Sequence, residues 1–256
     1  MNIALLTDFG TMDYFVGAVK GTILSINSNA TIIDITHEVP RHNVDAAAFL
    51  LAACYLDFPV GTIFLAVVDP GVGTNRRGLV VWSRERFFVG PDNGLFSFLL
   101  DNEADVFEIS NDSYFRKAVS NTFQGRDIFA PAAAHISAGA EISNFGRRIS
   151  DPVILDSIAV VRDGDLIEAR IIYIDHFGNL ITNLSPADLP SKFILRIGEH
   201  AITKVRENYD ESSADEPFFI VGSTGFMEIS VRQYSATRML NASVGQKLEI
   251  SAVEYA

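Results

Sequence analysis

The sequence has a single cysteine, Cys54, in 256 residues, so no disulfide can form within the chain. Cys54 lies in the apolar stretch AAAFLLAACYL, which predicts a buried thiol. Long uninterrupted apolar runs are missing as well, and the start MNIALLTDFG passes into a strand pattern without a basic segment. These absences favour a cytoplasmic protein that has neither an export signal nor a membrane anchor.

Basic charge is scarce and is nowhere concentrated. The chain has 20 Lys and Arg against 32 Asp and Glu, a formal net charge of −12, and no block of basic residues. Such a surface repels phosphate backbones, so we expect no nucleic-acid partner. The contents of hydrophobic residues (48%) and charged residues (20%) are ordinary for a globular protein, and the length allows one large or two modest domains.

The common signatures of phosphate, metal and nucleophile sites are also absent. The turn DPGVGTNRR looks like a phosphate-binding loop but has neither the GxxxxGK[ST] nor the GxGxxG spacing. The five histidines form no HExxH or other zinc-ligand spacing, and no GxSxG elbow occurs. We therefore expect no metal site, no P-loop and no dinucleotide-binding site of the GxGxxG type.

The first 150 residues alternate short β-branched runs with longer helical patterns. This alternation predicts an α/β domain with a mostly parallel sheet and helices on both faces, in which ligands bind beyond the carboxyl ends of the strands. The expected strands are 3–7, 31–36, 62–69, 78–83 and 86–90, and the expected helices are 14–26, 44–56 and 130–140.

After about residue 155 the chain consists of short strand-like runs separated by Gly, Asn and Asp. This pattern predicts a smaller, mostly antiparallel β-barrel domain. We expect the α/β domain to span 1–155 and the barrel domain 165–256, with the boundary near 151–164. The strand-like runs are 165–175, 179–184, 192–198, 217–223 and 247–253.

Several acidic residues follow predicted strands in the first domain. Asp8 and Asp69 are candidates for binding a ribose, because a carboxylate at a strand end can accept hydrogen bonds from both hydroxyls. The alternative is that each only shapes a turn. Arg76, seven residues after Asp69, could return beside it to hold a water or an anion, or it could be an exposed charge.

Two segments of the second domain carry candidate ligand contacts. In YIDHFGNLITN, Asp175 could bind a cationic amine, Phe177 could stack on a ring and Asn179 could pair with an adenine edge. The alternative is an Asn/Gly hairpin turn. In GSTGFMEISV, Ser223 and the backbone could approach a ligand, which Glu228 would face from a strand.

Seven segments in this order resemble the S-adenosyl-L-methionine (SAM) hydroxide adenosyltransferases, relatives of the fluorinase and chlorinase enzymes. They are TDFG, THEVPRH, VVDPGVGTNRR, PDNGLF, TFQGRDIFAP, YIDHFGN and GSTGFMEISV. The resemblance covers nearly the whole chain and implies a homotrimer with sites at subunit interfaces. It also implies that water or hydroxide displaces methionine from the 5′ carbon, giving adenosine and L-methionine. SAM is then a small-molecule substrate, and no cofactor is expected.

The resemblance also assigns roles to individual residues. Asp8 matches the ribose-binding aspartate, and Asp69 and Arg76 match two members of an Asp-Arg-His group that positions and activates the water. Asp175 and Asn179 match contacts to methionine and adenine. The closing segment contributes Ser223, Glu228 and Val231.

One position departs from the family pattern: Gln124 stands where TFHGRD has its histidine. A glutamine amide can orient a water through one donor and one acceptor, but it cannot take a proton near neutral pH. Two other functions stay open. A halide-using enzyme is disfavoured because Asp69 is retained with Arg76 and would repel the anion. A non-catalytic protein that binds adenosine or SAM is the other alternative, suggested by the loss of the histidine.

Overall fold

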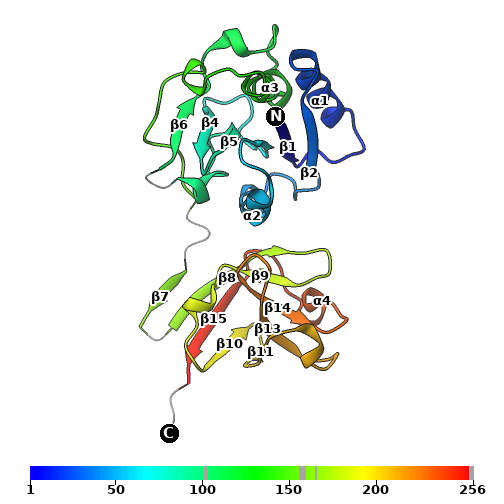
Figure 1. Cartoon of the computed structure of the whole chain (residues 1–256). Coiled ribbons are helices and arrows are strands. Elements are labelled where there is room, and N and C mark those ends of the chain that lie inside the picture. Colours follow the sequence, from blue (N-terminus) through cyan, green and yellow to red (C-terminus); the bar gives the residue numbers. More distant parts are fainter. Residues whose placement is uncertain (101–102, 156–159, 165, 254–256) are drawn as a thin grey trace. The chain divides into compact units, whose positions relative to one another are not determined.

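The computed structural model divides the chain into two compact units, Met1–Leu155 and Asp156–Ala256 (Figure 1). It describes residues 1–100, 103–155, 160–164 and 166–253. Residues 156–159, within the expected boundary, and residue 165, the expected start of the barrel domain, lie outside the described residues.

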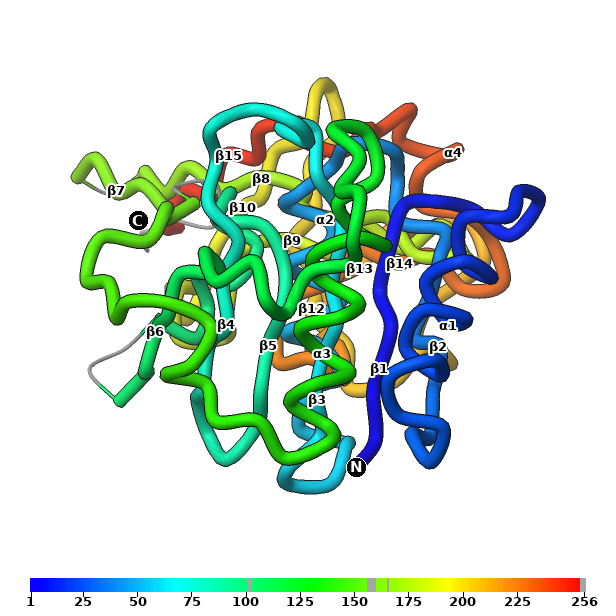
Figure 2. The backbone as a smooth tube through the Cα atoms, turned by 90° about the horizontal axis from the view of Figure 1, so that it is seen from above, coloured from blue at the N-terminus to red at the C-terminus, as the bar shows by residue number. Residues whose placement is uncertain are grey.

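The first unit contains a six-stranded sheet in the order β2-β1-β3-β5-β4-β6 (Figure 2). Its first four strands in this order pair in parallel, which confirms the predicted α/β class. Strands β4 and β5 form an antiparallel hairpin, because the two residues that join them, Arg84 and Glu85, both have positive φ (49° and 59°). The strands are β1 Asn2–Thr7, β2 Thr31–Thr36, β3 Ile63–Val67, β4 Gly78–Ser83, β5 Arg86–Pro91 and β6 Asp105–Glu108.

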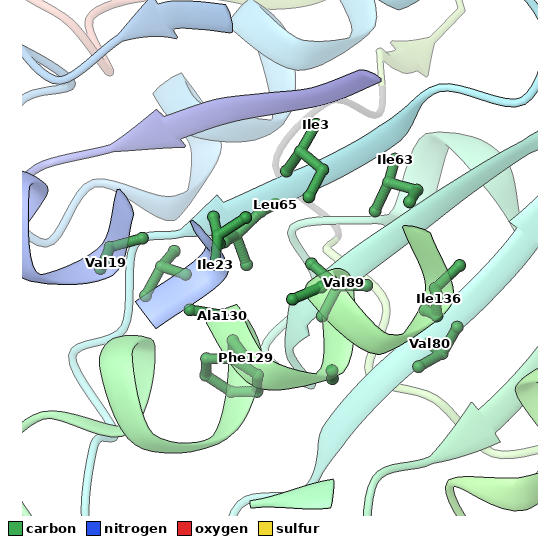
Figure 3. Close-up of a cluster of buried hydrophobic side chains, with 14 of the residues drawn as sticks. Ile3, Val19, Ile23, Ile63, Leu65, Val80, Val89, Phe129, Ala130 and Ile136 are labelled. Atoms are coloured by element: carbon green, nitrogen blue, oxygen red, sulfur yellow. The ribbon is translucent and has the colours of Figure 1, made fainter. Parts of the chain in front are cut away.

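Helices cover both faces of this sheet, as predicted (Figure 1). Helices α1 (Phe15–Ile26) and α3 (Ala130–Ser137) contact each other and pack on one face, and α2 (Val44–Cys54) contacts β1. Figure 3 shows how β-branched and leucine side chains of the strands meet the helix side chains in the main core. Burying this apolar surface contributes about 25 cal/mol per Å² of area removed from water.

The parallel register places the ends of β1 and β3 side by side. Thr7, the last residue of β1, pairs with Val67, the last residue of β3. The residues that follow, including Asp8 and Asp69, therefore emerge at one edge of the sheet. This edge is where ligands bind in open α/β folds.

The second unit contains a curled sheet of nine strands within the described ranges. Its strands pair antiparallel except β12 and β13, and β11 also lies close to β13, so the sheet bends into a half-barrel around its own core. A short helix, α4 (Ala236–Leu240), follows strand β14 in the chain. The strands are β7 Val161–Asp163, β8 Leu166–Ile174, β9 Leu180–Thr182, β10 Phe193–Ile197, β11 His200–Ile202, β12 Val205–Arg206, β13 Pro217–Val221, β14 Met227–Val231 and β15 Lys247–Ala252.

Cys54 is half-buried rather than fully buried, and its thiol donates to the Leu50 carbonyl at 3.3 Å. Burial, with a smaller contribution from Asp57, raises the pKa of the thiol to about 11. A thiol with this pKa is almost entirely protonated near neutral pH and is a weak nucleophile. In the described part of the chain, no helix is both long and apolar enough to cross a membrane.

Candidate active site

A pocket of about 330 Å³ lies at the carboxyl ends of β1 and β3. Three aromatic rings form its apolar wall, and Phe15 meets Phe123 edge to face with ring centroids 5.1 Å apart. Asp8 lines the pocket, and its Oδ2 accepts a hydrogen bond from the His42 backbone N–H at 2.9 Å. The aromatic rings are those of Phe9, Phe15 and Phe123.

Arg76 returns beside Asp69, which settles the alternative left open by the spacing. Its Nε donates to both carboxylate oxygens of Asp69, at 2.9 and 3.0 Å, and its Nη2 donates to Asp69 Oδ2 and to Gln124 Oε1. Arg76 also lies over the Phe129 ring, 5.1 Å from its centroid. The side chains of Asp69 and Arg76 are 5% and 11% exposed, so the ion pair is largely shielded from solvent.

The turn after β3 has the conformation that this contact requires. Gly73 has φ +78°, and a Cβ at this position would overlap the backbone carbonyl oxygen of Asn121. The turn therefore lies against the backbone just before Gln124. This close approach brings Arg76 and Gln124 together across 48 positions of sequence.

Gln124 immediately precedes a π-helical turn, Gly125–Phe129, which leads into α3. Asp127 is fully buried in this turn and accepts hydrogen bonds from the Ser120 N–H (2.8 Å) and Arg126 Nε (2.7 Å). Burial opposes its ionisation, but the Arg126 and Ser120 hydrogen bonds outweigh burial and hold the pKa of Asp127 below its usual value. Asp127 thus anchors the segment that carries Gln124.

In the second unit, Asp175 and Asn179 bind each other. The two Asp175 oxygens accept hydrogen bonds from the Asn179 backbone N–H and side-chain amide, each at 2.8 Å. This pair closes the turn between β8 and β9, which is the turn geometry that the sequence allowed as an alternative. Phe177 is 76% exposed at the tip of the same turn.

A cavity of about 660 Å³ in the second unit brings together three of the predicted residues: Phe177, Asn179 and Val231. Asp175, Ser223 and Glu228 are not among its lining residues. Glu228 is 8% exposed, and burial, followed by the charge of Asp175, raises the pKa of its carboxyl. The Tyr209 hydroxyl donates to Glu228 Oε2 at 3.4 Å, which partly offsets this effect.

Sequence reasoning missed several residues that line these two cavities. No sequence motif pointed to Asp13. Arg41 and His42 are the last two residues of the THEVPRH segment, to which no role was assigned. His42 has φ +63°, an uncommon value for a residue other than glycine. In the second unit the missed residues are Tyr209, Asp210, Arg232, Gln233, Tyr234, Ser235 and Arg238.

The other histidine of THEVPRH, His37, serves the fold. It is 5% exposed, and its Nδ1 lies 2.8 Å from the Thr7 hydroxyl, which in turn accepts from the Phe9 N–H at 3.3 Å. Its carbonyl oxygen accepts from the Gly10 N–H at 2.8 Å. His37 therefore holds the loop that presents Asp8.

Two segments of the chain match the two domains of one known family. Residues 3–146 match the SAM hydroxide adenosyltransferase N-terminal domain, and residues 169–249 match the corresponding C-terminal domain. The chain belongs to the SAM hydroxide adenosyltransferase family. The seven-segment resemblance seen in the sequence is thereby confirmed.

Members of the family differ in the activity that their names give. An (R)-S-adenosyl-L-methionine hydrolase from Salinispora tropica is 34% identical over 98% of this chain and 97% of its own length. A fluorinase from Actinopolyspora mzabensis is 26% identical over 97% of this chain and 96% of its own. A crystal structure of a conserved protein from Thermotoga maritima superposes with a TM-score of 0.88 at 35% identity, covering 97% of this chain and 99% of that one.

The close approach at Gly73 can be tested with a matched pair of glycine substitutions. Gly61→Ala introduces strain at φ +77° with no atom within 4 Å, and should lower the free energy of unfolding by about 1 kcal/mol. Gly73→Ala adds a steric overlap to the same strain and should cost about 1 to 3 kcal/mol more. Urea denaturation measures both. Equal losses would show that the turn does not depend on contact with the Asn121 backbone.

Proposed function

We propose that this protein hydrolyses S-adenosyl-L-methionine by attack of water on the 5′ carbon, giving adenosine and L-methionine. The observation that carries the proposal is the Asp69–Arg76–Gln124 contact at the edge of the sheet where Asp8 also lies. Membership of the family and the nearly full-length similarity to hydrolases from four organisms support the same reaction.

In this proposal the pocket of the first unit binds the ribose and the nucleophile. Asp8 keeps one carboxylate oxygen free of the His42 contact and accepts hydrogen bonds from the ribose hydroxyls. Phe9, Phe15 and Phe123 exclude bulk water from the reacting carbon. Because methionine leaves as a neutral thioether, alignment of water with the C5′–S bond supplies much of the rate acceleration.

The second unit supplies the contacts to adenine and methionine in the same proposal. Phe177, Asn179 and Val231 line one cavity and fit an adenine ring, with Phe177 stacking on its face. On the family resemblance, Asp175 is assigned to the methionine end, and Ser223 and Glu228 contribute to substrate binding from the closing segment. SAM is consumed as the substrate, and the reaction requires no cofactor.

We further propose that the protein acts in the cytoplasm as a homotrimer, with each site completed by a neighbouring subunit. The absence of any possible internal disulfide supports the cytoplasmic location. The family resemblance supports the homotrimer and the shared sites.

Light scattering at micromolar concentration should give a mass three times the 28.1 kDa of the chain. A monomer mass together with full hydrolase activity would refute shared sites.

The proposed reaction is tested by incubating the purified protein with SAM, its two sulfonium epimers assayed separately. The names of the relatives lead us to expect faster turnover of the (R) epimer. Adenosine and methionine should appear in equal amounts, and excess chloride should yield no 5′-chloro-5′-deoxyadenosine. Halogenated nucleoside would support the halide-using alternative, and saturable binding without product would support the non-catalytic one.

The pH dependence distinguishes Gln124 from a histidine base. Because an amide does not titrate, the rate should show no inflection near the usual histidine pKa of about 6.5. The control is His42→Asn, since His42 is the histidine that lines the pocket. An inflection near 6.5 in the wild type that disappears in this variant would assign the base to His42 instead.

Ribose binding by Asp8 can be measured independently of turnover. Asp8→Ala should weaken adenosine binding more than tenfold, a loss of about 1.4 kcal/mol or more, because two ribose hydroxyls then lack an acceptor. Calorimetry on wild type and variant gives the two affinities. An unchanged affinity would leave Asp8 with only its backbone contact to His42.

A further inference from the structure

The guanidinium of Arg76 donates its hydrogen bonds to other groups of the protein. Nε and Nη2 contact Asp69 and Gln124, and Nη1 lies 3.4 Å from the Arg77 carbonyl oxygen. Asp69 and Gln124 line the pocket, whereas Arg76 is not among its lining residues. The guanidinium therefore lies behind the two side chains that face a ligand.

This contact fixes the orientation of the Gln124 amide. A guanidinium only donates hydrogen bonds, so the Gln124 atom that faces Arg76 must be the carbonyl oxygen. Within the described part of the chain, no protein atom accepts a hydrogen bond from the Gln124 Nε2. The group that Gln124 can offer to a ligand in the pocket is consequently an N–H donor, not the donor and acceptor together that the sequence allowed.

The nucleophile end of the pocket thus presents one acceptor, Asp69, and one donor, Gln124. A neutral molecule with a proton and a lone pair, such as water, satisfies both groups. A halide ion has no proton for Asp69. Its entry is also opposed by negative charge, because Asp8 and Asp13 line the same pocket and outnumber its arginine, Arg41.

We propose that Arg76 is a positioning residue that fixes Gln124 as a donor beside the Asp69 acceptor, and that this pair selects neutral protic nucleophiles. The inference rests on the proposed hydrolysis. Water donates one proton to Asp69 and accepts a hydrogen bond from the Gln124 Nε2. Its remaining lone pair forms the C5′–O bond as the C5′–S electrons pass to sulfur, and the proton leaves through Asp69 to solvent.

The substitution Asp69→Asn tests the selection of the nucleophile. The new amide should turn its oxygen to Arg76, so that two N–H donors face the pocket and the arginine charge is no longer neutralised. Hydrolysis should fall about 100-fold or more. Chloride should now attack C5′ with loss of neutral methionine, so that 5′-chloro-5′-deoxyadenosine forms in proportion to chloride concentration, whereas wild type forms none.

A double-mutant cycle tests the positioning role. Arg76→Met and Gln124→Met should each lower kcat with little change in KM, because neither removes a contact to the nucleoside. If Arg76 acts through Gln124, the double variant should lose at least about tenfold less than the product of the two single losses. Arg76→Lys should not restore the rate, since one ammonium cannot reproduce the two-sided contact.

Adenosine affinity and urea midpoints confirm that each variant is folded. A folded, adenosine-binding Asp69→Asn variant that forms no chlorinated product overturns the selection of neutral nucleophiles. Losses that simply multiply in the cycle overturn the positioning role of Arg76. A wild type that does not hydrolyse SAM refutes the proposed function itself. Each of the three statements is thus refuted by a different experimental result.

Discussion

The ion pair between Asp69 and Arg76 is the interaction on which the candidate site depends. A largely buried ion pair stabilises a structure only when its remaining donors and acceptors are satisfied, because removing charges from water is costly. Here the guanidinium binds both oxygens of Asp69, takes the Gln124 carbonyl as a further acceptor and rests on the Phe129 ring. The same contacts that stabilise the pair therefore set the directions of Asp69 and Gln124 in the pocket.

The fold supplies what this pair needs from distant parts of the sequence. Parallel pairing of β1 and β3 brings Asp8 and Asp69 to one edge, and the turn at Gly73 lets Arg76 reach back. The buried Asp127 fixes the π-helical turn that begins beside Gln124. A π turn is an uncommon conformation that recurs at functional sites, and here it lies beside the residue that departs from the family pattern.

Much of the fold followed from the sequence, because strand and helix periodicities report burial directly. The antiparallel hairpin of β4 and β5 did not, since its turn residues, Arg84 and Glu85, lack the glycine that usually marks one. Asp8 and Asp69 were accessible as acidic residues after strands. The orientation of the Gln124 amide was not, because it depends on a partner 48 positions away whose approach is set by the backbone of a turn.

The same limit applies to the second unit. The sequence suggested that Asp175 and Asn179 contact a ligand. In the structure both Asp175 oxygens accept hydrogen bonds from Asn179 in a turn, while Asn179 also lines the cavity, a local competition that residue types alone do not resolve. Phe177 and Val231 come together in one cavity because the curled sheet brings the β8–β9 turn close to the end of β14. Such long-range juxtaposition has no short-range signature.

In the proposed reaction, water held by Asp69 and Gln124 attacks C5′. Its most direct test is turnover of SAM in water enriched in ¹⁸O, with mass spectrometry of the adenosine formed. We expect one ¹⁸O atom per adenosine, located on the 5′ carbon, and none in methionine. Adenosine without ¹⁸O at that carbon would contradict it.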